Sequence, residues 1–304
     1  MNALKTSYVT TSPECDFSLH NLPYGIYSTE NQSDKRIGVA IGEMILDIQF
    51  CEKMNFFEGI QFDKSVLFAT TINGLMALGK AINLQIRHRI QSILSLDFPA
   101  KNEVLSKGLV PQNEAIMHLP IQIGDYTDFY SSIEHATNVG KMFRDPNNAL
   151  LPNWRHLPVA YHGRASSICI SGTPFHRPKG QILDDTQAPI YSPTKALDFE
   201  LEIGTIIGKN SKIGLPINTN ESEDYVFGFV LFNDWSARDI QRWEYQPLGP
   251  FLGKNFFSSI SPWVVPLEAL QSFRTESSKQ NPPVLAYLQT EGLQNFDLNL
   301  SVSI

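Results

Sequence analysis

Short strand-like runs beyond residue 115 constrain the fold of this chain more than any other feature. Segments rich in β-branched and aromatic residues predict strands at 167–171, 199–207, 225–233 and 263–266. Helical patterns in the same region are limited to 131–143 and 236–243. Strands that outnumber helices, without a regular alternation of the two, indicate a β-dominated α+β fold.

The N-terminal segment predicts a smaller β-rich unit with one helix. Two short β-rich runs flank Gly42 and Glu43, a pattern that suits a hairpin. Apolar residues recur at helical spacing from Leu75 to Ile93, and Asn73 precedes them as a candidate N-cap. One substantial helix is therefore expected after the hairpin.

Chain length and the change in composition along the sequence together predict two domains. A chain of 304 residues exceeds the usual length of a single domain. The polar stretch at 99–114 is typical of a connector, so we expect an N-terminal domain over 1–115 and a second domain over 116–304. Near the end, residues 296–304 alternate apolar and polar side chains, which predicts a half-buried strand.

Charge and cysteine content exclude several classes of partner. The 24 basic and 31 acidic residues give a formal net charge of −7 without a basic block, so we expect no nucleic acid and no membrane as a partner. Cys15, Cys51 and Cys169 are widely spaced and odd in number, which favours free thiols in a reducing compartment. The N-terminus lacks a signal-like apolar core, and a cytoplasmic location is predicted.

The run from Asp125 to Gly140 combines a metal ligand with a possible base. Asp128 and Tyr130 lie just before a helix expected from Ser131 onward and capped by Ser131 or Ser132, and His135 falls one turn into it. A hard-metal ligand beside a general base suits metal-assisted hydrolysis. The alternative is a capping aspartate and a surface histidine. Arg144 is likewise either a solvated side chain or a fork-shaped donor for an anionic substrate.

Further carboxylates lie on two of the predicted strands. Glu200 and Glu202 share one face of a strand, because side chains alternate with period two. Asp234 follows the apolar run at 225–231, where a strand ends. Carboxylates buried side by side repel each other unless a cation joins them. The alternatives are an edge strand with a solvated acidic face and a helix cap at Asp234.

Cationic, amide and phenol side chains come next in the sequence, after Asp234. Arg238 and Gln241 are three residues apart and share a helix face, as do Gln241 and Tyr245, four apart. Such a face can present a guanidinium, an amide and a phenol to a carboxylate-bearing ligand. Lys254 lies in a stretch rich in Gly, Pro and aromatic residues, where desolvation would make it an electrostatic clamp. A solvated helix face and a flexible surface loop are the alternatives.

The acidic set defines the kind of metal site. All four candidate ligands carry only oxygen donors: Asp128, Glu200, Glu202 and Asp234. Carboxylate oxygens favour Mg²⁺ or Ca²⁺ over zinc. The sequence has neither the nucleophile elbow of serine hydrolases nor a Gly-rich nucleotide loop.

Long motifs in the chain closely resemble the fumarylacetoacetate hydrolase superfamily. The motifs are LPYGIYS (22–28), GDYTDFYSS (124–132), YHGRASS (161–167), NDWSARDIQ (233–241) and PLGPFLGK (247–254). The resemblance covers nearly the whole chain. Relatives that act on acylpyruvates or oxaloacetate share the acidic set but lack this N-terminal domain and the DFYSS segment.

The resemblance implies a fold, an assembly and an activity. It implies an SH3-like N-terminal barrel, a mixed β-roll of the fumarylacetoacetate hydrolase type, and a homodimer. The activity implied is metal-dependent cleavage of a small-molecule dioxo acid, fumarylacetoacetate, into fumarate and acetoacetate, the last step of tyrosine and phenylalanine degradation. The open alternatives are hydrolysis of a related acylpyruvate or β-diketone acid, and a non-catalytic truncated paralogue that binds metal or dimerises.

The resemblance also implies roles for individual residues. The divalent cation, Mg²⁺ or Ca²⁺, would bind Asp128, Glu200, Glu202 and Asp234, with Lys254 and Ser258 matching a second cation position. His135 would be the general base. Arg238, Gln241 and Lys254 would stabilise the oxyanion and the departing carbanion. The substrate would be positioned by Tyr130, Arg144, Tyr161, Gln241 and Tyr245.

Chains of that family continue beyond the last residue of this one. The resemblance places a substrate-contacting threonine and a glutamate that orients the base in the continuation. The β-roll is therefore expected to be incomplete here, with Phe296–Ile304 as one of its strands. The hypothesis that follows is that the full-length protein is active, whereas this segment alone is weak, inactive or poorly folded.

Overall fold

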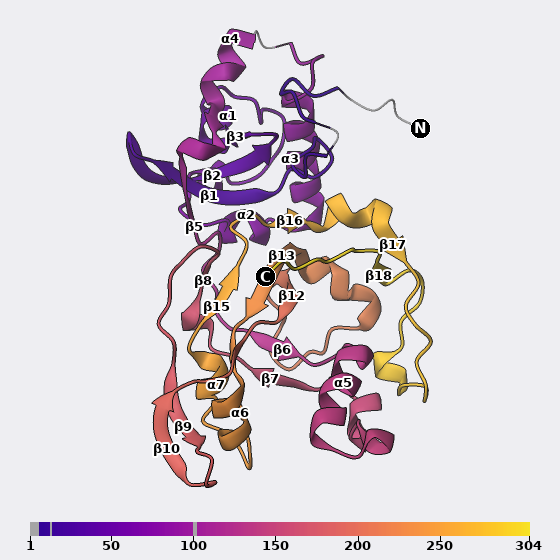
Figure 1. Cartoon of the computed structure of the whole chain (residues 1–304). Coiled ribbons are helices and arrows are strands. Elements are labelled where there is room, and N and C mark those ends of the chain that lie inside the picture. Colours follow the sequence, from indigo (N-terminus) through magenta and orange to yellow (C-terminus); the bar gives the residue numbers. More distant parts are fainter. Residues whose placement is uncertain (1–5, 13, 100–101) are drawn as a thin grey trace.

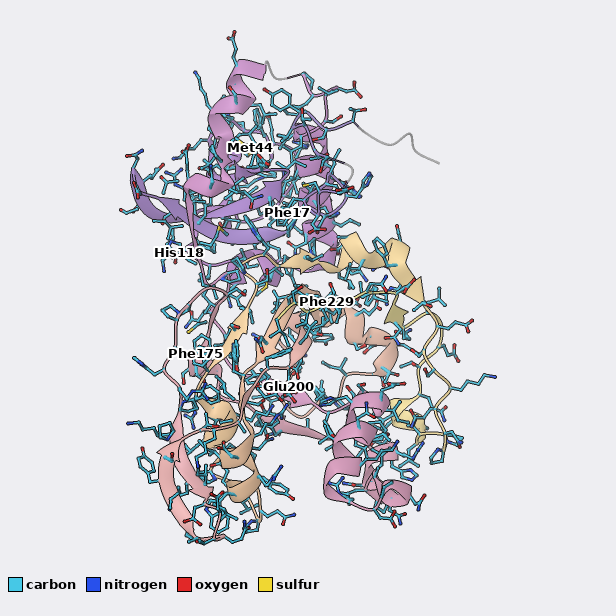
Figure 2. The ribbon with its side chains drawn as sticks, viewed as in Figure 1. Phe17, Met44, His118, Phe175, Glu200 and Phe229 are labelled. Carbon is cyan, nitrogen blue, oxygen red and sulfur yellow. The ribbon has the colours of Figure 1, made fainter. Side chains whose placement is uncertain are left out.

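The computed structural model describes residues 6–12, 14–99 and 102–304. It is a mixed α+β structure in which an N-terminal, sheet-containing part lies above a larger C-terminal part (Figure 1). Glu200 and Phe175 lie in the larger part, whereas Phe17 and Met44 lie in the smaller one (Figure 2).

The N-terminal part contains a five-stranded antiparallel sheet of order β4-β3-β2-β1-β5. Its strands are β1 (Tyr24–Thr29), β2 (Gln32–Ile41), β3 (Met44–Asp47), β4 (Leu109–Pro111) and β5 (Ala115–His118). The predicted hairpin is confirmed, because β2 and β3 are joined by the two residues Gly42 and Glu43. Gly42 has φ +57°, a conformation that favours glycine in such turns.

The predicted N-terminal helix is two helices. The helix α2 spans Asn73–Ala77, α3 spans Lys80–Ile93, and Gly79 between them has φ +82° and ψ +165°. Only glycine adopts this conformation readily, so the helical hydrogen bonds stop there. The prediction of Asn73 as N-cap is wrong. Its side chain instead accepts a 2.8 Å hydrogen bond from the Gln122 main-chain nitrogen and donates to the Gln122 carbonyl.

The segment read as a connector belongs to the N-terminal sheet. After the short helices α1 (Ile48–Lys53) and α4 (Asn102–Leu105), β4 pairs with β3, and Gln112 donates to the Glu43 carbonyl. Strand β5 pairs with β1 and extends this sheet to His118, three residues beyond the predicted boundary at 115. The described polar residues of this stretch lie in short helical turns around β4, which is itself an apolar, half-buried edge strand.

The C-terminal part is organised around one sheet of order β12-β13-β15-β8, with β16 also paired to β13. Its strands are β8 (Ile168–Ile170), β12 (Leu201–Ile207), β13 (Val226–Asp234), β15 (Ser258–Ile260) and β16 (Val265–Pro266). The predicted strands are thus present, each shorter than expected or shifted by about one residue. Both predicted helices are present as well, as α5 (Ile133–Phe143) and α6 (Arg238–Glu244).

Short elements surround this sheet. They are β6 (Thr127–Phe129), β7 (Ala160–His162), β9 (Lys179–Leu183), β10 (Pro189–Pro193), β11 (Leu197–Asp198), β14 (Ser236–Ala237), α7 (Leu252–Asn255), β17 (Arg274–Thr275) and β18 (Asn295–Phe296). The β9–β10 hairpin and helices α6 and α7 lie at one lower corner and α5 at the other (Figure 1).

The strand predicted at 296–304 is wrong. Only Asn295 and Phe296 pair with another strand, β17, and residues 297–304 are exposed and carry no regular secondary structure. An alternating pattern gives a strand only where a neighbour can accept its hydrogen bonds. Among the described residues no strand is paired with 297–304, and the Asp297 nitrogen donates one main-chain hydrogen bond to the Phe273 carbonyl.

One apolar core joins the two parts. Ile26 and Val39 of the N-terminal sheet belong to the same buried cluster as Phe232 and Ile260 of the C-terminal sheet. Two main-chain hydrogen bonds of 2.9 and 2.7 Å between Tyr24 and Val264 connect the parts directly. Among the described residues, no helix combines the length and apolar character that crossing a membrane requires.

The break between α2 and α3 yields a stability prediction. Replacing Gly79→Ala should lower the free energy of unfolding by about 1–3 kcal/mol, because a Cβ strains this backbone conformation although no atom lies within 4 Å of it. Gly124→Ala is the matched control, since Gly124 also has open space but no positive φ. Urea unfolding monitored by circular dichroism measures both. Equal stability of the two variants would contradict the account.

Candidate active site

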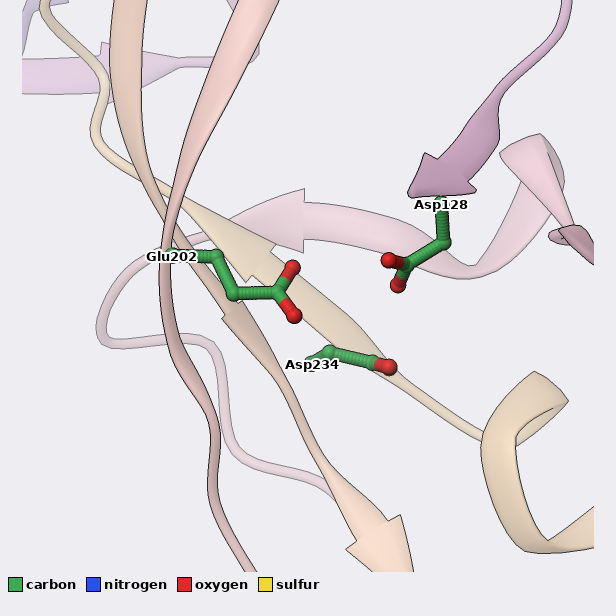
Figure 3. A group of neighbouring side chains, drawn as sticks. All are labelled: Asp128, Glu202 and Asp234. Atoms are coloured by element: carbon green, nitrogen blue, oxygen red, sulfur yellow. The ribbon is translucent and has the colours of Figure 1, made fainter. Parts of the chain in front are cut away.

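Three carboxylates from three different strands converge in the C-terminal part. Asp128 comes from β6, Glu202 from β12 and Asp234 from the end of β13. One oxygen of each lies within 4.8 Å of the others, and Figure 3 shows the three groups turned toward a common space. Asp234 is completely buried, whereas Asp128 and Glu202 are half-buried.

Strand pairing explains how two of the three meet. Strands β12 and β13 are antiparallel, with Glu202 opposite Phe232 and Leu201 opposite Asn233. Asp234 is the last residue of β13, so its carboxylate lies near Glu202, close to the end of the pairing. On the other side of β13, Ser258 of β15 pairs with Asp234. Asp128 belongs to a separate ladder, in which it lies opposite Tyr161.

Burial and the charges of neighbouring carboxylates raise the pKa values of Glu202 and Asp234. The pKa of Glu202 is raised to about 8 by burial first and then by the charges of Asp128 and Asp234. The pKa of Asp234 is raised to about 7 by burial, although the ammonium of Lys254 opposes this shift. Near neutral pH Glu202 and Asp234 are therefore partly protonated unless a cation replaces the protons.

The three carboxylates fit a hard divalent cation. Among the described residues, Asp234 Oδ1 is buried and has no hydrogen-bond partner, a rare and costly state. Three converging carboxylates offer only oxygen donors, which is the ligand set that Mg²⁺ or Ca²⁺ prefers. A bound cation would satisfy the free oxygen and remove the repulsion.

Glu200, the fourth predicted metal ligand, is engaged by cationic side chains instead. It lies in the break between β11 and β12, not within the strand as predicted. Its carboxylate forms a 2.7 Å ion pair with Arg238 Nη2 and another with Lys254. Burial alone would raise its pKa, but Lys254 and Arg238 lower the pKa to about 2.

The predicted cluster of donors lies beside the carboxylates. Lys254 in α7 is buried, pairs with Glu200 and contacts Asp234 Oδ2 at 2.5 Å. Burial would lower the pKa of Lys254, but the two carboxylates outweigh it and raise the pKa. Arg238 donates from Nη1 to Gln241 Oε1 at 3.2 Å, which confirms that the two share a helix face. Because this bond uses the amide oxygen, the Gln241 nitrogen remains available as a donor.

His135 lies at the edge of this charged cluster. Ser132 caps α5 by accepting a hydrogen bond from the His135 main-chain nitrogen, as the sequence predicted. The exposed imidazole has Nε2 at 3.6 Å from Glu200 Oε1, and its ring packs edge-on against Tyr130 at 5.5 Å. Glu200 thus connects the histidine to Arg238 and Lys254.

The remaining predicted residues divide into two groups. Tyr161 contacts the carboxylate site directly, because its hydroxyl donates to Asp234 Oδ2 at 3.0 Å. Tyr130, Arg144 and Tyr245 do not reach it. Tyr130 donates to the Ala136 carbonyl, Arg144 donates to the Ala149 carbonyl, and the Tyr245 side chain is 46% exposed.

Two residues of the site were not predicted from the sequence. The Tyr126 hydroxyl lies 3.3 Å from Asp128 Oδ2 and 3.0 Å from the Tyr161 hydroxyl. Asp198 accepts a 2.8 Å hydrogen bond from Arg238 Nε. Period-two spacing places Tyr126 on the same face as Asp128, so a signal for it existed, whereas the pairing of Asp198 with α6 depends on tertiary structure.

The raised pKa values predict that cation binding releases protons. At pH 7, Mg²⁺ should displace about one proton, because the protonated forms of Glu202 and Asp234 compete with the cation. Apparent affinity should therefore increase as the pH rises from 6 to 8 and level off above the higher pKa. Calorimetric titrations in two buffers of different ionisation enthalpy measure the release. Glu202→Gln should reduce it, and an identical binding heat in both buffers would count against this site.

Comparisons with known proteins identify the family of this chain. The family model described as Fumarylacetoacetate (FAA) hydrolase C-terminal matches residues 125–302, and Fumarylacetoacetase N-terminal matches residues 20–120. The human Fumarylacetoacetase is 48% identical over 302 residues, covering 98% of this chain and 72% of its own. The Caenorhabditis elegans Fumarylacetoacetase is 49% identical over 305 residues, with the same two shares. Among solved structures, the fumarylacetoacetate hydrolase of Exiguobacterium antarcticum aligns at 16% identity with a TM-score of 0.47, covering 82% of this chain and 68% of its own. This chain belongs to the fumarylacetoacetate hydrolase family.

Proposed function

We propose that this chain hydrolyses a carbon–carbon bond of fumarylacetoacetate, giving fumarate and acetoacetate, with Mg²⁺ or Ca²⁺ as its cofactor. The observation that carries the proposal is the triad of Asp128, Glu202 and Asp234 directly beside the buried ammonium of Lys254. Relatives at 48–49% identity named Fumarylacetoacetase support the choice of substrate. The combination suits a dioxo acid, whose cleavage leaves a carbanion that needs positive charge nearby.

The triad would hold the cation, which when bound polarises the ketone oxygens of the substrate and favours the enolate form of the leaving group. Asp234 contributes its unpaired Oδ1, while its Oδ2 accepts hydrogen bonds from Tyr161 and Lys254. Those two bonds fix the carboxylate plane, so the free oxygen faces a defined direction.

His135 is the proposed general base. Its imidazole would take a proton from the water that attacks the carbonyl carbon on the fumaryl side, so that hydroxide adds to this carbon. Glu200 Oε1, 3.6 Å from Nε2, would stabilise the imidazolium that forms. The carbon–carbon bond then breaks, its electron pair goes to the methylene carbon, and the proton returns to that carbon to complete acetoacetate.

Arg238, Gln241 and Lys254 would stabilise the negative charge that develops in both steps. Fixed donors are effective in a buried site, because no reorganisation is needed when the charge appears. Arg238 is fixed from two sides, with Nε bonded to Asp198 and Nη2 bonded to Glu200. Lys254 is held by Glu200 and Asp234, so its ammonium stays in the site despite burial.

Substrate positioning is the proposed role of Tyr130, Arg144, Tyr161, Gln241 and Tyr245. Arg144 is exposed and donates from Nη1 to the Ala149 carbonyl, and a guanidinium carries five N–H donors. The remaining N–H donors of Arg144 suit a substrate carboxylate. Tyr161 stacks on Phe251 with centroids 5.9 Å apart, so an aromatic wall lies beside Asp234.

We also propose the fold details, the second cation position, the homodimer and the location that the family resemblance implies. A five-stranded antiparallel sheet supports an SH3-like barrel, and the sheet around β13 supports the β-roll, with Ser258 and Lys254 near a second cation position. A homodimer is supported by large apolar side chains on the surface, such as Tyr191 at 74% and Leu248 at 81% exposure. A cytoplasmic location completes the proposal.

Loss of fumarylacetoacetate absorbance tests the activity. The purified protein should consume the substrate with Mg²⁺ or Ca²⁺, release fumarate and acetoacetate in equal amounts, and stop when a chelator is added. His135→Asn should lower kcat by about 10²–10⁴-fold, as expected for loss of a general base, while leaving KM nearly unchanged.

His156→Asn is the matched control, because His156 is exposed and follows a short 3₁₀ turn outside the carboxylate site. Turnover that persists in chelator would rule out the cation. Equal loss in the two histidine variants would remove His135 from the mechanism.

A further inference from the structure

Asp128 and Asp234 belong to separate sheets, and main-chain pairing does not fix their separation. Strand β6 pairs only with β7 among the described strands, whereas β13 pairs with β12, β15 and β16. A cation held by both carboxylates needs their oxygens at a constant distance. Side chains that bridge the two sheets must therefore set the distance between the Asp128 and Asp234 carboxylates.

Tyr126 provides that bridge. Its hydroxyl lies 3.3 Å from Asp128 Oδ2 and 3.0 Å from the Tyr161 hydroxyl. Tyr161 in turn donates to Asp234 Oδ2 at 3.0 Å. A phenol has one proton, and that of Tyr161 is given to Asp234. The single proton of Tyr126 is therefore shared between two acceptors, the Tyr161 hydroxyl oxygen and Asp128 Oδ2, in a three-centre hydrogen bond. The hydrogen bonds thus run without interruption from Asp128 to Asp234.

The Tyr126 ring is fixed by packing that does not depend on the carboxylates. It packs against Phe232 of β13 at 5.5 Å between centroids and edge-on against Tyr161 at 6.3 Å. Its main-chain carbonyl accepts a 3.0 Å hydrogen bond from the Gly163 nitrogen. A Cβ at Gly163 would lie 1.7 Å from ring atom Cε1, so only glycine leaves room for the ring there.

We infer that Tyr126 is a positioning residue for the cation site, whose hydroxyl fixes Asp128 and, through Tyr161, Asp234 at the spacing a divalent cation needs. The inference rests on the proposed cation-binding function. Tyr126 itself contacts neither cation nor substrate in this role. It transmits the rigid packing against Phe232 to the two ligands that lie on different sheets.

Calorimetric titration of the chelator-treated chain with Mg²⁺ tests the inference. Tyr126→Phe keeps the ring and removes only the hydroxyl, and it should weaken Mg²⁺ binding by about 10–100-fold, the usual effect of losing a contact that orients a ligand. Gly163→Ala keeps the hydroxyl but displaces the ring, and it should weaken binding to a similar extent. The second variant also provides the test if the first does not fold.

Two matched controls separate the hydroxyl from general effects of substitution. Tyr191→Phe removes an exposed hydroxyl on β10, and Gly124→Ala adds a Cβ where no atom lies within 4 Å. Both should bind Mg²⁺ like the unaltered chain. The thermal melting temperature of Tyr126→Phe in chelator should be similar to that of the unaltered chain, because a purely structural role of the hydroxyl would lower it without cation.

The double variant Tyr126→Phe/Tyr161→Phe should bind no more weakly than the worse single variant, since both hydroxyls act in one chain of hydrogen bonds. Unchanged affinity in Tyr126→Phe, or losses that add in the double variant, would overturn the inference. Failure of the unaltered chain to bind Mg²⁺ is a separate outcome, which would overturn the proposed cation site and this inference with it.

Discussion

Repulsion between buried carboxylates is the constraint on which the rest of the C-terminal part depends. One carboxylate oxygen each of Asp128, Glu202 and Asp234 lies within 4.8 Å of the others, and burial and the neighbouring charges raise the pKa of Glu202 to about 8. Such a group is stable only if protons or cations occupy it. Lys254 supplies one positive charge from α7, and the unpaired Oδ1 of Asp234 leaves a position for a divalent ion. The charge distribution and the proposed chemistry thus have one physical origin.

The N-terminal sheet contributes to this site without touching it. Its apolar face shares a core with Phe232 of β13, the strand that ends in Asp234, and with Ile260 of the neighbouring strand β15. Main-chain hydrogen bonds between Tyr24 and Val264 attach the two parts where β16 meets β13. Because protein cores are densely packed, this attachment limits how far β13 can move relative to its neighbours. A fixed β13 is what the spacing of the carboxylates requires.

Local patterns in the sequence predicted most helices and strands. The predictions that failed concern features that depend on tertiary contacts. Alternation and helical spacing located the strands and helices of the C-terminal part, and Ser132 caps α5 as expected. Burial of Lys254 followed from its apolar surroundings. The separation of Glu200 from the other carboxylates was not predictable, because it depends on a strand break and on ion pairs with residues 38 and 54 positions away. Period-two spacing from Asp128 offered a signal for Tyr126, but its contact with Tyr161 depends on tertiary structure.

Anomalous diffraction from crystals soaked in Mn²⁺, which takes the same oxygen ligands as Mg²⁺, tests the central claim most directly. The account predicts one strong peak within bonding distance of Asp128, Glu202 and Asp234, with Asp234 Oδ1 among the ligands. It also predicts that Glu202→Gln weakens this peak. A peak elsewhere, or none at saturating Mn²⁺, would contradict the assignment of these carboxylates as a cation site.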